Sequence, residues 1–247
     1  MGFEKKDLDV VLVPGGLLIM LVYHLQLLYR YLHKPHTTCM GFENFNKRFW
    51  VQAIMQGEKG NIGTCLGVIS SNRSAATFLA SVSLILCSLI GAWISNNNNF
   101  FFESNLVYGD TRTSTLSIKY VVLLICFLLA FSCFIQSTQH FVHANDLISM
   151  PSPSIPLKNV EVAIIRGSDF WSVGLRALYF ALNLLLWFFG PIPMFVCSIF
   201  MVLFLYYLDS NTMPLIEHDF DGRQVVRKVE QSVSEMAMAI RMPSHQN

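Results

Sequence analysis

The sequence has few charged residues, and their near balance in sign excludes one class of partner. Only 13% of its 247 residues are Asp, Glu, Lys or Arg, against about 25% in an ordinary soluble domain. The net charge is +1, so the chain lacks the basic excess that binding to nucleic acid requires. Because 53% of the residues are apolar, a lipid bilayer is the expected environment.

The motifs of familiar enzymes are also missing. The sequence contains no G-x-S-x-G, no H-E-x-x-H, no P-loop and no G-x-G-x-x-G. Of the six cysteines, Cys39 and Cys65 lie in one predicted loop without the C-x-x-C spacing of a metal site, and the other four lie inside apolar runs. No cofactor is predicted, and these absences favour a protein that is not an enzyme.

Long apolar runs decide the fold class, because about 20 apolar residues cross a hydrocarbon core. Four regions qualify, at about residues 10–32, 75–94, 118–136 and 177–208. The third continues as a polar helix to about residue 148. We therefore predict an all-α polytopic membrane protein, a four-helix transmembrane bundle with a proline-broken fourth helix. Residues 1–209 form this transmembrane domain, and residues 210–247 form a C-terminal tail with a short amphipathic helix.

The second apolar region carries small residues at three- and four-residue spacing. They are Ala76, Ala80, Ser83, Cys87 and Gly91. This spacing places them on one helix face, which close contact between helices in lipid requires. The pattern predicts packing against a neighbouring helix.

Lysine and arginine predict the orientation. The loop 33–73 holds five of these residues and the loop 95–117 holds one, so the first loop is expected in the cytosol and the N-terminus outside. The tail is also basic, which favours a cytosolic location for it. The tail would lie in the cytosol only if the fourth region crosses the membrane twice. The length of that region favours one kinked crossing, and on this basis both termini are expected outside.

The break in the fourth region, Gly190-Pro191-Ile192-Pro193, is the first candidate site. Pro191 removes the helical hydrogen bond to the carbonyl of Trp187, and Pro193 removes the one to Phe189. A free carbonyl in lipid is costly, so the break must face the bundle. It is either a kink whose carbonyls are satisfied by neighbouring side chains, or a site for an ion or small solute, as in the broken helices of transporters.

Two other patterns carry polar chemistry into apolar surroundings. His24 lies inside the first span, where an ionisable residue faces the interior, either as a functional group or as a neutral ring hydrogen-bonded to a neighbouring helix. His140, His143 and Asp146 form one stripe at the polar end of the third helix. These side chains can bind zinc or iron. The alternative is a polar helix end at the level of the lipid headgroups.

Several stretches together make the chain similar to a plant family of uncharacterised multi-pass membrane proteins, those bearing domain of unknown function 599. The resemblance covers roughly residues 7–209, and its most specific part is the Gly-Pro-Ile-Pro block with its flanks. It implies a plant source and about four spans, and no activity. Many members have proline where this chain has Asn183, and this departure shifts the helix geometry by one turn here. The stretches are NKRFWV, NI, TFLAS, LLICFLLAFSCFIQS, GLRALYFALNLLLWFFGPIPMF and LYYLDS.

Three classes of function fit the sequence. The first is a non-enzymatic scaffold or regulatory membrane protein, with protein partners bound through the loop 33–73 and the tail. The second is a transporter or channel that uses the broken helix, with His24, Asn183, Gly190, Pro191 and Pro193 as ligand or ion residues. The third is a membrane metalloenzyme that uses the histidine stripe. The expected location is the plasma membrane or another endomembrane.

Overall fold

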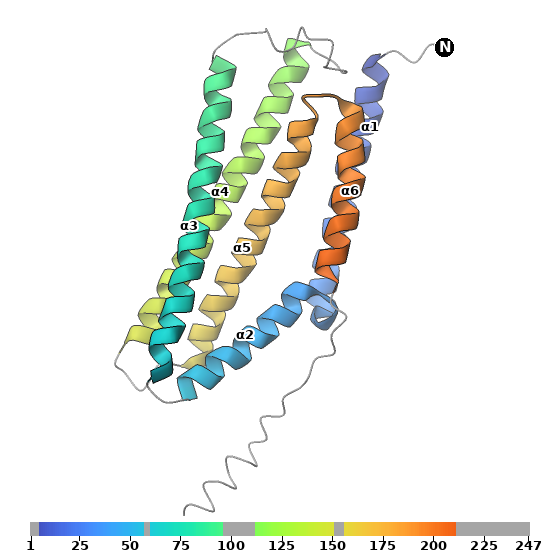
Figure 1. Ribbon diagram of the computed structural model, residues 1–247. Helices are drawn as coiled ribbons and strands as arrows, with labels where there is room; N and C mark the ends of the chain where they lie inside the picture. The colour runs from blue at the N-terminus through green and yellow to red at the C-terminus, as the bar shows by residue number, and fades with distance from the viewer. Residues whose placement is uncertain (1–4, 57–59, 96–111, 151–155, 211–247) are drawn as a thin grey trace, which may run out of the picture. The chain divides into compact units, whose positions relative to one another are not determined.

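The computed structural model describes residues 5–56, 60–95, 112–150 and 156–210, which all belong to one compact unit (Figure 1). Apart from an isolated β-bridge, the regular structure in this part of the chain is helical, and the predicted all-α class is confirmed. The helices are α1 Lys5–His33, the short 3-10 helix η1 Pro35–Thr37, α2 Cys39–Gln56, α3 Gly60–Ser95, α4 Thr113–Ser149, α5 Leu157–Leu186 and α6 Pro191–Asp209. The predicted tail helix lies outside the described residues.

The long helices run along one another and form a bundle (Figure 1). α3 packs on α4, α4 packs on α5, and α6 packs on both α5 and α1. α5 therefore joins the α3–α4 pair to the α1–α6 pair. α2 lies across the end of the bundle where α1 ends and α3 begins.

Four helices are long and apolar enough to cross a membrane. The qualifying segments are Leu8–His33 in α1, Ile62–Ile94 in α3, Ser114–Ser149 in α4 and Pro191–Asp209 in α6. Their outer faces leave large apolar side chains bare: Leu25, Leu129 and Leu203 are each more than half exposed. Monomeric soluble proteins rarely show apolar surface on this scale, and hydrocarbon chains cover it without cost. These helices and their apolar outer faces are compatible with a membrane protein and suggest a lipid bilayer as the environment.

The fourth apolar region contains two helices rather than one kinked helix. α5 ends at Leu186, the chain turns, and α6 starts at Pro191. Gly190 makes the reversal with a φ of 146°, which side-chain-bearing residues rarely adopt. Figure 1 shows that α5 and α6 run in opposite directions. The predicted break is present, but it is a hairpin turn, because a proline in the first helical position sacrifices no hydrogen bond and starts a new helix there.

The hairpin also corrects the expected positions of the chain ends. A single kinked crossing would leave the end of the fourth region on the same side as the start of α1. Instead, α1 begins at one end of the bundle and α6 finishes at the other (Figure 1). There, Ser210 forms an isolated β-bridge with Thr38, next to the start of α2. The predicted placement of both ends on one side is wrong for the described part of the chain.

The helices extend well beyond a bilayer at the α2 end. At about 1.5 Å per residue, α3 and α4 are about 55 Å long, against about 30 Å for a hydrocarbon core. The predicted loop 33–73 is mostly helical, because it contains α2 and the first part of α3. We call residues 39–56, 60–72, 139–149 and 157–172 the platform. Its core comprises Val51, Cys65, Ile69, Phe141, Ala144, Ile148, Val160, Ala163 and Ile164.

Small residues let the central helices approach closely. Ala76, Ala80, Ser83 and Cys87 of α3 are all buried, so the predicted small-residue face is confirmed at these positions, whereas Gly91 is exposed. Glycines of α5 accept aromatic rings of α4 in the same way: a Cβ at position 174 would lie 2.8 Å from Phe134, and one at position 167 would lie 2.9 Å from Phe141.

We expect the substitution Gly190→Ala to destabilise the bundle. The φ of 146° and ψ of 168° at this residue lie in a region that is essentially restricted to glycine. The free energy of unfolding should fall by about 1–3 kcal/mol, seen as a lower thermal midpoint in detergent. Gly91→Ala is the matched control, because a Cβ there meets nothing within 4 Å. Equal midpoints for the two variants would contradict the role of the turn.

Candidate functional site

Polar side chains recur every seven residues along α5. Asp169, Arg176 and Asn183 share one face, because seven residues make about two helical turns. Each of them hydrogen-bonds to α1 or α6. We call this row and its partners the polar seam. The partners are Tyr31, Tyr23 and Met20 of α1, Asn44 of α2, and Asp209 and Ser198 of α6.

Arg176 and Asp209 form the charged centre of the polar seam. Arg176 Nη1 donates to Asp209 Oδ2 at 2.7 Å, and Nη2 donates to Oδ1, so the pair is bidentate. The hydroxyl of Tyr23 also donates to Asp209 Oδ2, at 2.5 Å. The two charged side chains are only 15% and 10% exposed. Each ion has therefore lost most of its water and depends on the other for compensation of its charge.

Asn183 joins α5 to α6 one level further along the seam. Its Nδ2 donates to Ser198 Oγ at 2.7 Å and lies 3.2 Å from Met20 Sδ of α1. Gly16 makes room for this contact, because a Cβ there would lie 2.8 Å from Ser198 Oγ. Asn183 is fully buried, and its Oδ1 has no hydrogen-bond partner among the described residues.

His24 lies beside the seam and bonds within its own helix. Its Nδ1 is 2.7 Å from the carbonyl oxygen of Met20, one turn earlier in α1. The ring rests against Phe180 of α5, with 4.8 Å between the centroids. The sequence analysis offered a hydrogen bond from His24 to a neighbouring helix, whereas the bond found in the structure is to Met20 of the same helix. The buried Nε2 has no partner within the described part of the chain.

The carbonyl of Trp187, which lies at the end of α5, accepts a hydrogen bond from a buried lysine. Lys119 of α4 is 1% exposed, and its Nζ donates to the carbonyl oxygen of Trp187 at 3.1 Å. The same ammonium lies 5.1 Å from the centre of the Trp187 ring, a cation–π contact. Trp187 Nε1 donates in turn to Asp9 Oδ1 at 3.1 Å. A cation of the protein itself thus sits at the broken helix end, and binding of a further ion there stays a prediction.

The other residues of the predicted break form the turn between α5 and α6 or the start of α6. Gly190 and Pro191 are buried in the bundle, and Pro193 is exposed on α6. The last amides of the turn bond back to carbonyls of α5, among them Phe189 N to Leu186 O at 3.0 Å. The geometry brings Gly190 and Pro191 near Lys119 and Trp187. It places Asn183 further along α5, and His24 on α1 beside Phe180 of α5.

The sequence analysis missed the charged pair although a signal was present. Arg176 and Asp209 stand at the two outer ends of the fourth apolar region, and both resembled ordinary interfacial charges of a single span. In a hairpin the two ends of that region meet. An opposite charge at each end is therefore a feature that distinguishes two crossings from one.

Two members of the histidine stripe, His140 and His143, face a groove between α4 and α5, and Asp146 is not part of its lining. His140 stacks on Phe170 of α5 with 5.5 Å between the ring centroids. His140 and His143 line the groove together with Lys158 and Arg166. Among the described residues, no group of three or more His, Cys, Asp or Glu side chains is placed to hold a metal ion. Metal binding by His140, His143 and Asp146 stays a prediction, and the two neighbouring cations oppose it electrostatically.

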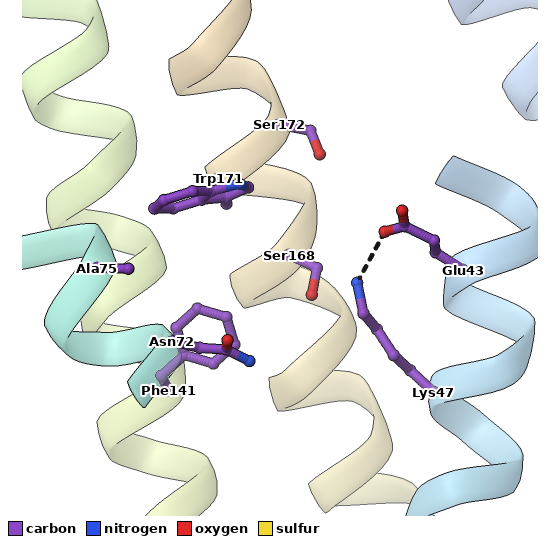
Figure 2. Close-up of a pocket in the computed structure, with 8 residues that line it drawn as sticks. All are labelled: Glu43, Lys47, Asn72, Ala75, Phe141, Ser168, Trp171 and Ser172. Carbon is purple, nitrogen blue, oxygen red and sulfur yellow. Dashed lines mark hydrogen bonds and ion pairs between the residues drawn. The ribbon is translucent and has the colours of Figure 1, made fainter. Parts of the chain in front are cut away.

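A smaller pocket opens between α2, α3, α4 and α5 (Figure 2). Its volume is about 180 Å³. One wall carries the ion pair of Lys47 Nζ and Glu43 Oε2, at 3.3 Å, and Ser168 and Ser172 of α5 lie opposite. Trp171 and Phe141 provide aromatic surface. The pocket has room for a few water molecules or one small polar group.

The hydrogen bonds of the seam join α1, α5 and α6. The Tyr23 hydroxyl donates to a carboxylate that Arg176 already neutralises, and the Ser198 hydroxyl donates to the Met194 carbonyl oxygen at 3.0 Å. Neither hydroxyl is hydrogen-bonded to a histidine that could accept its proton. These groups hold α1, α5 and α6 together.

The sequence model of one protein family matches most of the chain. It covers residues 11–214, and the family is described as "Protein of unknown function, DUF599". No curated protein and no solved structure matches the chain. The matched residues include the whole polar seam and the platform.

We expect Arg176 and Asp209 to depend on each other for stability. Arg176→Met or Asp209→Leu alone leaves a buried ion without its partner and should lower the free energy of unfolding by about 3–5 kcal/mol. The double variant should lose much less than the sum, because no unpaired ion remains. Thermal unfolding in detergent measures this coupling.

The control for this cycle is the exposed pair of Lys47 and Glu43, whose side chains are 30% and 58% exposed. Lys47→Met should change the free energy of unfolding by no more than about 1 kcal/mol. Additive losses at Arg176 and Asp209 would show that the buried ions do not compensate each other.

Proposed function

The chain belongs to the DUF599 family of proteins of unknown function, and from this premise we propose that it is a multi-pass membrane scaffold. In this proposal the bundle crosses the bilayer five times and holds the platform at the cytosolic surface, where it binds protein partners. The plant source implied by the resemblance, and a location in the plasma membrane or another endomembrane, belong to the same proposal.

The hairpin supports five crossings. Beyond the platform, residues 173–186 of α5 cover about 21 Å at the helical rise, and the turn that follows carries the chain on to Pro191, where α6 starts back alongside. α5 is not among the four helices that are apolar enough to count as candidate spans, because it carries the seam. The charged and polar groups of the seam are paired inside the protein. Five crossings also put Ser210 on the same side as α2, and the sequence that follows Ser210 is basic, which fits the positive-inside rule.

The observation that carries the scaffold function is the packed platform. α2 packs against α5 and α3, and its Val51 is only 2% exposed. α2 is therefore part of the packed core of the platform. Its other face is polar: Asn46 and Arg48 are exposed. Because this polar surface is already rigid, little conformational entropy is lost when another protein binds to it. Such a surface is suited to contact with a protein partner.

A second candidate function, transport of an ion or small solute, is favoured by one specific feature. His24 Nε2 and Asn183 Oδ1 are buried polar atoms without a hydrogen-bond partner among the described residues. Both side chains also contact Met20, so the two atoms belong to the same stretch of the seam. Polar groups that face the interior of a membrane bundle often mark the path of a solute.

Five crossings predict the exposure of three inserted epitope tags in sealed membrane vesicles. Tags after Lys34 and after Ser210 should be digested by protease from the same side. A tag between α3 and α4 should be accessible only from the other side. If the tag after Ser210 instead behaves like the one between α3 and α4, the fourth region crosses once and the topology proposed is wrong.

The scaffold function predicts protein cross-links from the platform. A photoreactive residue in place of Asn46 or Arg48 should give a discrete protein adduct in native membranes, because these side chains face water. The matched control is Val121 of α4, which is 53% exposed on the apolar surface and should label lipid alone.

Lipid adducts alone at both platform positions would contradict the scaffold function. Solute flux through the purified chain in vesicles, lost on Asn183→Leu, would then favour transport.

A further inference from the structure

A basic groove lies between α4 and α5 at the platform end of the bundle. Its polar lining consists of Gln139, His140 and His143 from α4 and Lys158, Asn159 and Arg166 from α5. Its volume is about 540 Å³, within the range of small-ligand sites. The lining contains two cations and two imidazoles and no acidic residue. The groove therefore combines positive charge with hydrogen-bond donors, the chemistry that recognises phosphate.

Lys158 and Arg166, the cations of the groove, form no ion pair within the described residues. Among the described residues, the ion pairs join Lys47 to Glu43 and Arg176 to Asp209, and neither involves Lys158 or Arg166. The acidic residues of α5 are engaged elsewhere. Glu161 accepts a hydrogen bond from Gln52 at 2.9 Å, and Asp169 accepts from Tyr31 and Asn44 at 3.0 and 2.9 Å.

One wall of the groove is held in place. The ring of His140 stacks on Phe170 with an interplanar angle of 16°, which fixes its orientation, while His143 and Arg166 are exposed toward solvent. Because Gln139 and Asn159 add neutral amide donors, an anion in the groove could be bonded from both helices.

The groove lies next to the outer edge of the lipid headgroups. Ile135 is the last large apolar side chain exposed on α4 before its end at Ser149, a stretch that the structure describes throughout. His140 and His143 lie about 8–12 Å beyond Ile135 at the helical rise. The headgroup layer is about 5–8 Å thick on each side of the hydrocarbon core. The nearer end of the groove, at His140, therefore lies at the outer edge of this layer, within reach of a phosphate group that projects beyond it.

We propose that the basic groove binds the phosphorylated headgroup of an anionic membrane lipid. Arg166 and Lys158 contact the phosphate oxygens, and the histidines and amides donate further hydrogen bonds. Phosphate monoester groups, as on phosphatidylinositol bisphosphate, suit the site better than a single diester, because they present more charge and more acceptor oxygens. The site lies in the α4 and α5 part of the platform, and Asn46 and Arg48 do not line it. It rests on the proposed position of the bundle in the membrane and not on the binding of protein partners.

The test is native mass spectrometry of the detergent-solubilised full chain. The probes are phosphatidylinositol bisphosphate, phosphatidylserine at equal total charge, and inorganic phosphate. We expect an adduct of phosphatidylinositol bisphosphate that is at least about tenfold tighter than that of phosphatidylserine. Arg166→Gln and Lys158→Gln should each weaken it about tenfold, and Arg166→Lys should retain part of the binding. Both positions are exposed, so the fold should persist.

The matched control is Arg48→Gln, which removes an exposed cation of α2 outside the groove and should leave binding unchanged. Equal weakening by Arg48→Gln and Arg166→Gln would reduce the effect to general surface charge and overturn the site. Equal binding of phosphatidylserine would also overturn it. If inorganic phosphate binds as tightly as the lipid, the proposal that the ligand is a membrane lipid is wrong. Stoichiometric zinc that is lost on His140→Ala would overturn the anion site in favour of metal.

Discussion

The ion pair between Arg176 and Asp209 is the constraint on which the bundle depends. Two side chains that are 15% and 10% exposed cannot stay ionised apart in an apolar bundle, so the helices that carry them must lie together. Those helices are α5 and α6, and they can meet only if the chain reverses at Gly190. Because Tyr23 donates to the same carboxylate, the pair also fixes α1 against them. The hairpin, the packing of α6 on α1 and the position of the last described residues beside α2 all follow.

The sequence was most informative about local properties. Apolar length predicted the four candidate spans, and the steric rule for proline identified Trp187 as the residue whose carbonyl would be freed. The structure adds which group satisfies that carbonyl: Lys119, from a helix that is distant in the sequence. The small-residue face of α3 was also predictable, because spacing along one helix determines which residues share a face.

Properties that depend on two helices at once could not be predicted. The metal interpretation of His140 and His143 considered α4 alone, whereas Lys158 and Arg166 of α5 complete the same groove and change its charge. The length of the fourth region was compared with one bilayer thickness, and that comparison favoured a kink. The charges at both ends of the region would have favoured a hairpin, but their meaning depends on the fold they help to form.

The separation of Tyr23 from Asp209 along the chain also has a consequence for biosynthesis. The two bonded residues are 186 positions apart. At about 5–20 residues per second, the ribosome needs roughly 10–40 s to make Asp209 after Tyr23. During that interval α1 has already left the exit tunnel with its polar side chains unmatched. The bond between the first helix and the last can therefore form only after almost the whole described part of the chain has been made.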